Sequence, residues 1–456
     1  MRPITAWLLL LANLMLLASA PGQTSALPAQ GTSALAGDAG HGLAVFDSLC
    51  KSLEDNYPML ELVGWRNEWI EEFRERIARA DHDEARFELM EELVCRLNDY
   101  HTRLSWPGRP RLTRPPVLVE PVLTRAELPP PYGIWGQVHP PLELPPLDDV
   151  AIAVVEAERS CGLQAGDEIL SVDGVPVREA LARAWRHSVC SSVAGKLRGA
   201  AAGMLRGEPG KPACLVIRRN SERGLETVTV IAPRGGLERA LISSREVEGI
   251  PVIRISQWSN RRDEDLTARF DELLESFRER PGLILDVRGN GGGQDGLAGM
   301  IVGRFLNRPI IASISFHRLV PALTYERTVD RIMPRGPWRY AGRVAVLADE
   351  GCMSACEHFV SGMIEAGALV CGTPTSGACG WIRTVDLGDG VKLNVSETFP
   401  LHTGGIPSLQ LGMAPHLWAP RRLADLRAGQ DTALREAVTW LKTDKPVPVR
   451  LQPLAR

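Results

Sequence analysis

Apolar residues recur at helical spacing in the first part of the chain, among many charged residues. Val45, Leu49 and Leu53 lie four residues apart, which places their side chains on one face of a helix. Two more series have similar spacing, so the pattern predicts a small helical domain over residues 40–106. These series are Trp69, Phe73 and Ile77, and then Phe87, Leu89, Leu93 and Leu97.

Prolines crowd the next segment, residues 107–147, in runs such as PGRPRLTRPP and ELPPPYGIWGQVHPPLELPP. Proline lacks a backbone N–H and fixes φ, so this segment excludes long helices and central strands. We predict a linker that contains one or two edge strands.

Residues 148–235 begin with a pattern that is typical of a small β domain. The string DDVAIAVVEAERSCGLQAGDEILSVDGVPV indicates a strand, a short loop and a second strand that ends in an Asp-Gly turn. Its part GLQAGDEILSVDG resembles the PDZ domain, which captures peptide C-termini by strand addition. The resemblance implies a PDZ-like domain over residues 148–235.

From residue 236 to residue 456, short apolar runs alternate with helical patterns. PVIRIS, GLILDV and RVAVLA have the composition of buried strands, and DEDLTARFDELLESF has helical spacing. Such alternation is typical of an α/β layer around a buried sheet. A chain of 456 residues is also longer than one core can serve. We therefore predict an α+β multidomain protein with a helical domain, a small β domain and an α/β core.

Charge and the N-terminal segment bear on partners and location. The net charge of −3 gives no basic field, so we expect no nucleic-acid partner. Arg2 precedes an apolar stretch from Ala6 to Ala18, and small residues follow it. This stretch is shorter than the ~20 residues of a spanning helix, so residues 1–26 are interpreted as a signal peptide. We expect a periplasmic or secreted protein without a stable membrane span.

Nine cysteines in an exported chain allow disulfides, although the odd number leaves at least one cysteine unpaired. Their pairing stays open at this point. They form no CxxC ladder and have no His-rich partner segment, so the sequence implies no zinc site and no other metal or organic cofactor.

The segment GLILDVRGNGGG, residues 282–293, ends a buried strand in a glycine-rich turn. Glycines let backbone N–H groups approach a ligand closely. A P-loop would need Gly-Lys-Ser/Thr at its end, whereas Gln294 and Asp295 follow here. A Rossmann fingerprint would follow the first strand with a different spacing. The remaining interpretation is a loop that stabilises an oxyanion.

In the stretch GCMSACEHF, Ser354 lies between the strand RVAVLA and a helical run. We expect this helix from about Ala355 to Ala366, with Gly367 as its C-cap. A serine at a helix start is commonly an N-cap that accepts a backbone N–H. The same position suits a nucleophile, because N–H groups at a helix start stabilise an oxyanion.

These two segments, taken together with the PDZ-like string, carry a family resemblance. LILDVRGNGGG and VAVLADEGCMSACEHFVSGMIEAGALVCGTPTSGACG resemble the C-terminal processing (tail-specific) serine peptidases, the tricorn protease core and related retinoid-binding modules. LNDYHTRL and the tail GMAPHLWAPRRLADLRAGQDTALREAV extend the likeness over most of the chain. It implies a layered, crotonase-like α/β core, polypeptide substrates and Ser354 as the nucleophile. The oxyanion hole would be formed by the N–H of Ala355 and that of a glycine in 291–293, with Gly291 and Gly292 as candidates.

The chain departs from the tail-specific pattern at the base. Those members place a lysine after the serine helix, where Ala378 stands here, and Lys392, the closest downstream lysine, is expected to face solvent. In the tricorn-like branch the base comes from a segment similar to LNDYHTRL, which identifies His101. A glutamate on a later strand completes the relay there, and Glu397 matches that place. The resemblance thus implies a Ser-His-Glu triad.

Other interpretations compete with this triad. His358 lies one helical turn after Ser354, but its position carries no base in the family. Cys352 and Cys356 flank the serine, although thiols in an oxidising compartment are more often paired or packed. His101 and Glu397 could also be structural side chains. The sequence therefore predicts an exported serine peptidase, with a catalytically inactive scaffold that binds peptides or small apolar ligands as the alternative.

Overall fold

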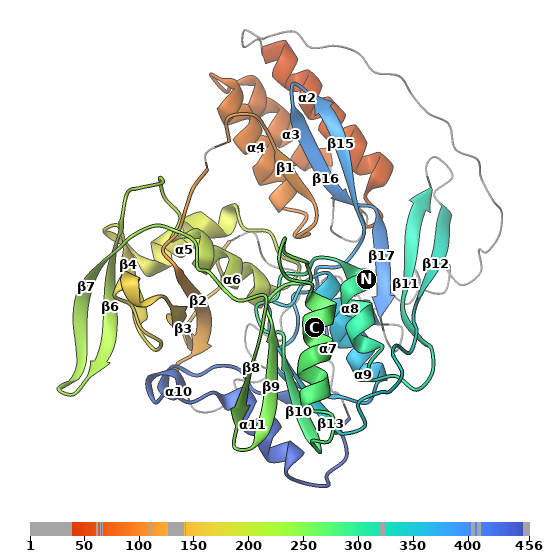
Figure 1. The fold of residues 1–456 in the computed structure, drawn as a ribbon. Helices are drawn as coiled ribbons and strands as arrows, with labels where there is room; N and C mark the ends of the chain where they lie inside the picture. The colour runs from red at the N-terminus through yellow and green to blue at the C-terminus, as the bar shows by residue number, and fades with distance from the viewer. Residues whose placement is uncertain are drawn as a thin grey trace.

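The computed structural model describes residues 39–60, 63, 65, 67–109, 111–125, 141, 143–319, 324–402, 406–407 and 412–449. The predicted signal peptide, residues 1–26, lies outside these ranges. None of the helices in the described ranges is long and apolar enough to cross a membrane. Figure 1 shows a helical part, a β-rich part and a larger α/β part in contact with each other.

The helical part combines the helices at the start of the described chain with a small sheet whose strands come from distant places in the sequence (Figure 1). The sheet is antiparallel, with the order β1-β16-β15, and Arg103 lies opposite Asn394. Leu49, Leu53 and Phe73 from the helices share one core with Leu393 from the sheet. The elements are α2 (Ala39–Asn56), α3 (Asn67–Ala78), α4 (Asp83–Cys95), β1 (Arg103–Ser105), β15 (Ile382–Gly388) and β16 (Val391–Ser396).

The β-rich part is an antiparallel sheet with the order β2-β3-β4-β6-β7. β2 comes from the proline-rich segment and lies at the edge of the sheet, where proline is tolerated. Asp173 and Gly174 both have positive φ and form the turn after β4, as the Asp-Gly signal predicted. The elements are β2 (Val117–Leu123), β3 (Val150–Ala157), a 3-10 turn (Arg159–Cys161), β4 (Glu168–Val172), β5 (Val175–Pro176), α5 (Val177–Arg186), α6 (Val193–Gly203), β6 (Ala213–Ser221) and β7 (Gly224–Ala232).

A six-stranded sheet with the order β19-β14-β13-β10-β9-β8 forms the centre of the α/β part. Only β8 is antiparallel to its neighbour. α7, α8 and α9 contribute to the core on one face of this sheet, and α11 packs on the other. The elements are β8 (Ile242–Val247), β9 (Ile250–Ile255), α7 (Leu266–Ser276), β10 (Gly282–Asp286), α8 (Asp295–Val302), β13 (Arg343–Ala348), α9 (Ala355–Glu365), β14 (Leu369–Gly372), β19 (Leu417–Trp418) and α11 (Thr432–Leu441).

A second antiparallel sheet of this part has the order β12-β11-β17-β18. It links the helical part to α9, because Phe316 and Phe399 join the helical core while Ala312 joins the core around α9. The strands of this sheet are β11 (Ile310–Leu319), β12 (Thr324–Ile332), β17 (Thr398–His402) and β18 (Ile406–Pro407). A further short helix, α10 (Leu423–Arg427), precedes α11 in the chain.

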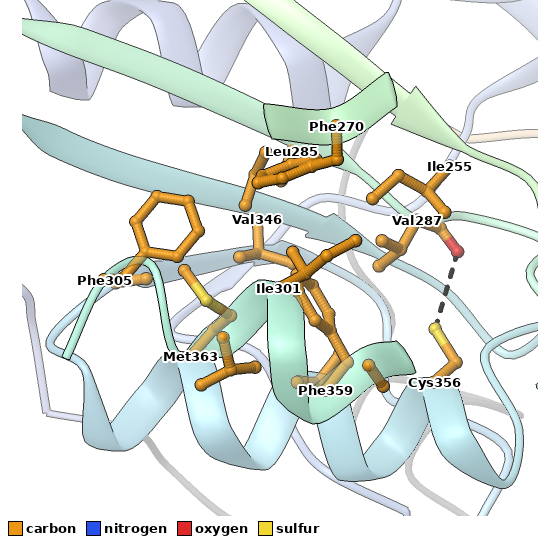
Figure 2. Packing of buried hydrophobic residues seen from close by; sticks show 14 of the residues in the cluster. Ile255, Phe270, Leu285, Val287, Ile301, Phe305, Val346, Cys356, Phe359 and Met363 are labelled. Atoms are coloured by element: carbon orange, nitrogen blue, oxygen red, sulfur yellow. Dashed lines mark hydrogen bonds between the residues drawn. The ribbon is translucent and has the colours of Figure 1, made fainter. Parts of the chain in front are cut away.

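Buried side chains fix α9 against the central sheet. Figure 2 shows Phe359 of α9 packed among Ile301 of α8 and Leu285 and Val346 of the strands. The ring of Phe359 also lies 4.7 Å from that of Trp258, measured between centroids. Because β10 and β13 are parallel neighbours, their carboxyl ends meet at one edge of the sheet. This edge carries both the glycine-rich turn and the start of α9, the usual place for a site in an α/β sheet.

Candidate active site

Ser354 has a backbone conformation that non-glycine residues rarely adopt. Its φ is +54° and its ψ is −124°, and α9 begins at the next residue. Its side chain makes no capping hydrogen bond to the helix, which rules out the N-cap interpretation. Such strain costs ~1–3 kcal/mol and is concentrated at functional sites. A strained serine between a strand and a helix is also the arrangement of the nucleophile elbow in α/β-hydrolases.

The loop between β14 and β15, residues 373–381, holds the turn that carries Ser354. The N–H of Ser354 donates to the carbonyl of Ala378 at 2.7 Å, and the N–H of Ser376 donates to the carbonyl of Cys352 at 3.0 Å. Ala378 is fully buried and provides only a methyl group at the position where the tail-specific pattern has lysine. The loop therefore positions the serine through its backbone and offers no base at this residue.

The glycine-rich turn approaches Ser354 as closely as its lack of side chains allows. Gly292 has a φ of +98°, and a Cβ atom there would lie 2.8 Å from the Cβ of Ser354 and 3.3 Å from the nitrogen of Ala355. The N–H of Gly292 donates to the side-chain oxygen of Asn290 at 3.0 Å. A Cβ atom at Gly291 would meet nothing within 4 Å. The structure thus brings the predicted serine, helix start and glycine turn together.

His101 is buried beside the loop between β14 and β15, which contains Cys379. Burial lowers the pKa of its imidazole, while Asp99, Asp295 and a hydrogen bond to the backbone of Cys379 act in the opposite direction. Its Nδ1 atom is buried and has no hydrogen-bond partner among the described residues. An imidazole with a lowered pKa is neutral at pH 7, which is the state a general base requires.

The turn before β1 fixes the backbone of His101. The carboxylate of Asp99 accepts the N–H of His101 at 3.0 Å and the hydroxyl of Thr102 at 2.7 Å. The same hydroxyl oxygen accepts the N–H of Ser396 at 3.2 Å. This contact ties the histidine turn to the end of β16, next to Glu397.

The predicted third residue, Glu397, lies between β16 and β17. Its carboxylate accepts a hydrogen bond from Nε of Arg383 at 2.6 Å and is partly exposed. The backbone places it close to the His101 turn, but the side chain pairs with arginine. Lys392 is exposed on β16, as its alternating pattern indicated.

Two carboxylates that the sequence interpretation did not single out lie near the histidines. Asp295, the first residue of α8, interacts electrostatically with both His101 and His358, and burial raises the pKa of its carboxyl. Nε2 of His358 lies 3.4 Å from Asp330 on β12. His358 thus has a partner on the side of β12. The position of Asp295 two residues after the glycine turn was the only sequence signal for its place.

Glu357, three residues after Ser354, fastens the loop that contacts the serine. One of its carboxylate oxygens accepts the N–H of Gly377 at 2.8 Å and the hydroxyl of Thr375, and the other lies 3.0 Å from the sulfur of Cys379. Burial raises the pKa of this carboxyl to about 7, against the opposing effect of these hydrogen bonds. The residue is fully buried, so its role is to shape the loop.

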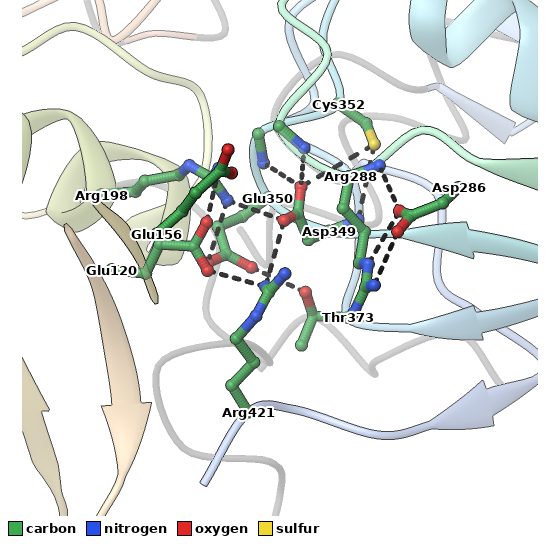
Figure 3. Close-up of polar contacts among 12 residues, drawn as sticks. Glu120, Glu156, Arg198, Asp286, Arg288, Asp349, Glu350, Cys352, Thr373 and Arg421 are labelled. Carbon is green, nitrogen blue, oxygen red and sulfur yellow. Dashed lines mark hydrogen bonds and ion pairs between the residues drawn. The ribbon is translucent and has the colours of Figure 1, made fainter. Parts of the chain in front are cut away.

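Figure 3 shows a buried cluster of charges where the β-rich part meets the α/β part. Asp349 lies in the turn that leads to Ser354, and Oδ1 of its carboxylate accepts the N–H groups of Gly289 and Gly351 at 2.8 and 2.9 Å. Its Oδ2 lies 2.9 Å from Nη1 of Arg198 on α6. The arginine also lies 2.7 Å from Glu120 on β2. This carboxylate therefore joins the serine turn, the glycine turn and the β-rich part.

Thiol groups next to the serine have no features of a nucleophile. Cys352 and Cys356 are fully buried, and burial raises the pKa of Cys352 well above its usual value. All nine cysteines lie in the described ranges, and none of them is joined to another by a disulfide in the structure. The disulfides that the sequence allowed are not formed here.

Comparison with known proteins places this site in a family. Residues 249–416 match the model of peptidase family S41, and this range contains the glycine turn, Ser354 and Glu397. This part of the chain is similar to peptidase family S41. Two curated relatives support this assignment: the carboxy-terminal processing protease CtpB of Bacillus subtilis (strain 168) and the carboxyl-terminal-processing protease of Picosynechococcus sp. (strain ATCC 27264 / PCC 7002 / PR-6).

The extent of these similarities is limited. The Bacillus protein is 27% identical over 52% of this chain and 44% of its own length. The Picosynechococcus protein is 25% identical over 51% of this chain and 50% of its own length, so the chain spans about half the length of both relatives. The similarity in fold to solved structures covers more of the chain than these sequence matches do. The solved structure of mature CPAF complexed with lactacystin has a TM-score of 0.62 and 16% identity, over 88% of this chain and 98% of that one.

Proposed function

We propose that this chain is an exported serine peptidase that hydrolyses peptide bonds of polypeptides through a Ser-His-Glu acyl-enzyme mechanism. The observation that carries the proposal is the strained backbone of Ser354, whose hydroxyl does not cap α9 and lies beside a glycine turn. The match of residues 249–416 to family S41 and the names of the two curated relatives support a polypeptide substrate.

In the proposed reaction, Oγ of Ser354 attacks the carbonyl carbon of the scissile bond and its proton passes to His101. The N–H of Ala355 has no acceptor within the helix, because it is the first residue of α9. It stabilises the oxyanion, and the helix dipole adds to this effect. Of the two glycines that the sequence predicted as the second donor, Gly291 is preferred, since Asn290 already accepts the N–H of Gly292.

The second half of the reaction returns the enzyme to its starting state. His101 donates its proton to the leaving amine, and the C–N bond breaks to give an ester on Ser354. Water then attacks this ester with His101 as the base, which releases the new carboxylate. Glu397 is the proposed partner of the imidazole: its carboxylate must turn from Arg383 to Nδ1 of His101, the atom without a hydrogen-bond partner among the described residues.

Two further parts of the proposal rest on the sequence. Export to the periplasm or secretion follows from the signal-peptide pattern of residues 1–26. The β-rich part is proposed to be a PDZ-like domain, supported by the string GLQAGDEILSVDG and by the Asp173–Gly174 turn that it forms. Such a domain would bind the C-terminal residues of a polypeptide as an added strand.

A serine-directed fluorophosphonate probe tests the activity. We expect the wild-type protein to be labelled and Ser354→Ala to be unlabelled, with His101→Ala labelled at least ~10²-fold more slowly. His358→Ala and Lys392→Ala serve as matched controls that retain labelling, because His358 pairs with Asp330 and Lys392 is exposed. No labelling of folded wild-type protein would contradict the proposal and favour a non-catalytic scaffold. Loss of labelling in His358→Ala alone would move the base to that residue.

A further inference from the structure

One lysine of the chain is buried, and it lies near the candidate site. The sequence has six lysines, and Lys196 on α6 is only 4% exposed. Its position in the β-rich part, far from the serine in sequence, gave no signal of a role at the site.

The contacts of Lys196 connect α6 to the turn that carries His101. Its Nζ atom donates to the side-chain oxygen of Asn98 at 2.8 Å and lies 4.9 Å from the ring centroid of Trp185. Asn98 has a φ of +50°, which asparagine tolerates better than most residues. The next residue, Asp99, accepts the N–H of His101. Lys196 therefore binds the first residue of the turn Asn98–His101. Asp99 of the same turn fixes the backbone of His101.

The environment of Lys196 is costly for an ammonium group. No carboxylate among the described residues forms an ion pair with it, and burial lowers its pKa to about 8, with the thiols of Cys95 and Cys190 acting in the opposite direction. A buried charge without an ionic partner opposes folding. Such groups are concentrated where a function requires them.

The same helix also holds the serine side of the site. Arg198, two residues after the lysine, contacts Asp349 in the turn before Ser354. The sulfur of Cys190, shortly before α6, lies 3.0 Å from the hydroxyl oxygen of Ser376 in the loop that binds the serine backbone. Lys196 is the member of this group that reaches the histidine turn, so α6 contacts segments that lead to both proposed reacting residues.

We propose that Lys196 is a positioning residue for His101: through Asn98 it holds the histidine turn in the place where the imidazole can accept the proton of Ser354. This inference rests on the proposed peptidase function. It assigns to the β-rich part a side chain that acts on the base without contacting substrate.

Two variants test the contact. Lys196→Met keeps an unbranched apolar side chain and removes the ammonium, and Asn98→Gly removes the acceptor while allowing a positive φ. We expect each to slow fluorophosphonate labelling of Ser354 about tenfold, the usual effect of losing a hydrogen bond to a charged group. The double variant is expected to be no slower than the slower single variant, because both changes remove the same contact. Lys211→Met, a change of an exposed lysine that pairs with Glu208 in the same part, should label at the wild-type rate.

The pH dependence distinguishes positioning from general damage. The titratable groups that face Lys196 are the thiols of Cys95 and Cys190, and burial raises the pKa values of both. As the lysine loses its charge, its hydrogen bond to Asn98 weakens. We expect the rate ratio of wild type to Lys196→Met to shrink between pH 7 and pH ~9.5. A ratio that is constant with pH, together with a lower melting temperature of the variant, would overturn the proposal in favour of a purely structural role.

A second measurement does not depend on catalysis. In Ser354→Ala protein, the imidazole of His101 can be titrated by NMR with and without Lys196→Met. We expect its pKa to shift by ~0.5 unit or more when the turn is released. An unchanged titration would overturn the proposal even if the wild type is labelled. If wild-type protein is not labelled but the titration shifts, the proposed peptidase function fails while the positioning contact stands.

Discussion

Arg198 and Asp349 form an ion pair of 2.9 Å that connects helix α6 of the β-rich part to the turn before Ser354. Both side chains are buried. The other carboxylate oxygen of Asp349 accepts two backbone N–H groups, from Gly289 and Gly351. A single carboxylate thus fixes the glycine turn and the serine turn relative to each other and to α6.

Breaking this ion pair should impair both stability and labelling. Arg198→Met leaves Asp349 with Arg421 at 3.3 Å as its ionic partner and removes one partner of Glu120. We expect a loss of ~3 kcal/mol in unfolding free energy, because Arg198 then no longer offsets its share of the cost of burying Asp349 and Glu120. Labelling of Ser354 should slow as well. Urea unfolding and the labelling rate measure the two effects.

Arg218→Met is the matched control for this change. Arg218 lies in the same part of the chain, but it is exposed and its contact with Glu168 is 3.4 Å long. Exposed ion pairs contribute ~0–1 kcal/mol, so this variant should resemble the wild type. Equal unfolding midpoints for the two variants would contradict the role given to Arg198.

Two adjacent glycines of the glycine turn offer a sharper comparison. Gly292→Ala places a methyl group 2.8 Å from both the Cβ of Ser354 and the carbonyl oxygen of Met353, at a φ of +98°. Gly291→Ala meets nothing within 4 Å. We expect the first change to reduce labelling of Ser354 by ~10²-fold or more through displacement of the serine turn, and the second to fold and label close to wild type. Similar labelling of both variants would contradict the close approach of the two turns.

Local patterns in the sequence predicted the serine side of the site. The runs GLILDV and RVAVLA are neighbouring strands β10 and β13, and the helix expected from Ala355 is α9. Parallel pairing of the two strands brings the glycine turn to Ser354, which explains why two segments ~60 residues apart could be joined correctly. Each signal lies within a few residues of the feature that it predicts.

The histidine side depends on contacts that no local pattern records. The pairing of β1 with β16 brings the turn of His101 to the end of β16, almost 300 residues later in the chain. The hairpin of β15 and β16 lies on the helical part, although sequence patterns placed it with the α/β core. The contact of Lys196 with Asn98 and the closeness of Asp295 to the two histidines could not be seen either, because packing alone brings these residues together.

Glu357 should make stability depend on pH near neutrality. Its pKa is about 7 in the folded protein, against an ordinary value of 4.5, so the folded state binds the proton more tightly than the unfolded state. Stability is therefore expected to fall as pH rises from about 4.5 to about 7, by up to ~3 kcal/mol from this group. Burial and Asp349 raise the pKa of Glu350 to about 7 as well, and it contributes in the same direction.

Glu357→Gln tests this dependence, because the amide does not titrate. We expect the unfolding midpoint in urea to decline less between pH 5 and pH 7.5 in this variant than in the wild type, with Glu350 causing the remaining decline. Glu365→Gln is the control, since Glu365 is exposed at the end of the same helix. An identical pH dependence in Glu357→Gln and wild type would show that the carboxylate is not the group responsible.

The pairing of Arg383 with Glu397 determines the last prediction. If the carboxylate must turn from the arginine to Nδ1 of His101, then releasing it should help the base, and removing its charge should harm it. We expect Arg383→Met to increase the labelling rate of Ser354 a few-fold, and Glu397→Gln to lower it by ~10²–10⁴-fold. The acid limb of the pH profile should move to higher pH in the first variant, because a nearby carboxylate raises the pKa of an imidazole. Lys392→Met, on adjacent β16, should change neither quantity.

If Glu397→Gln labels as fast as the wild type, the glutamate is only a surface partner of Arg383. The imidazole must then be oriented by Asp99 or Asp295, the carboxylates that act on the pKa of His101.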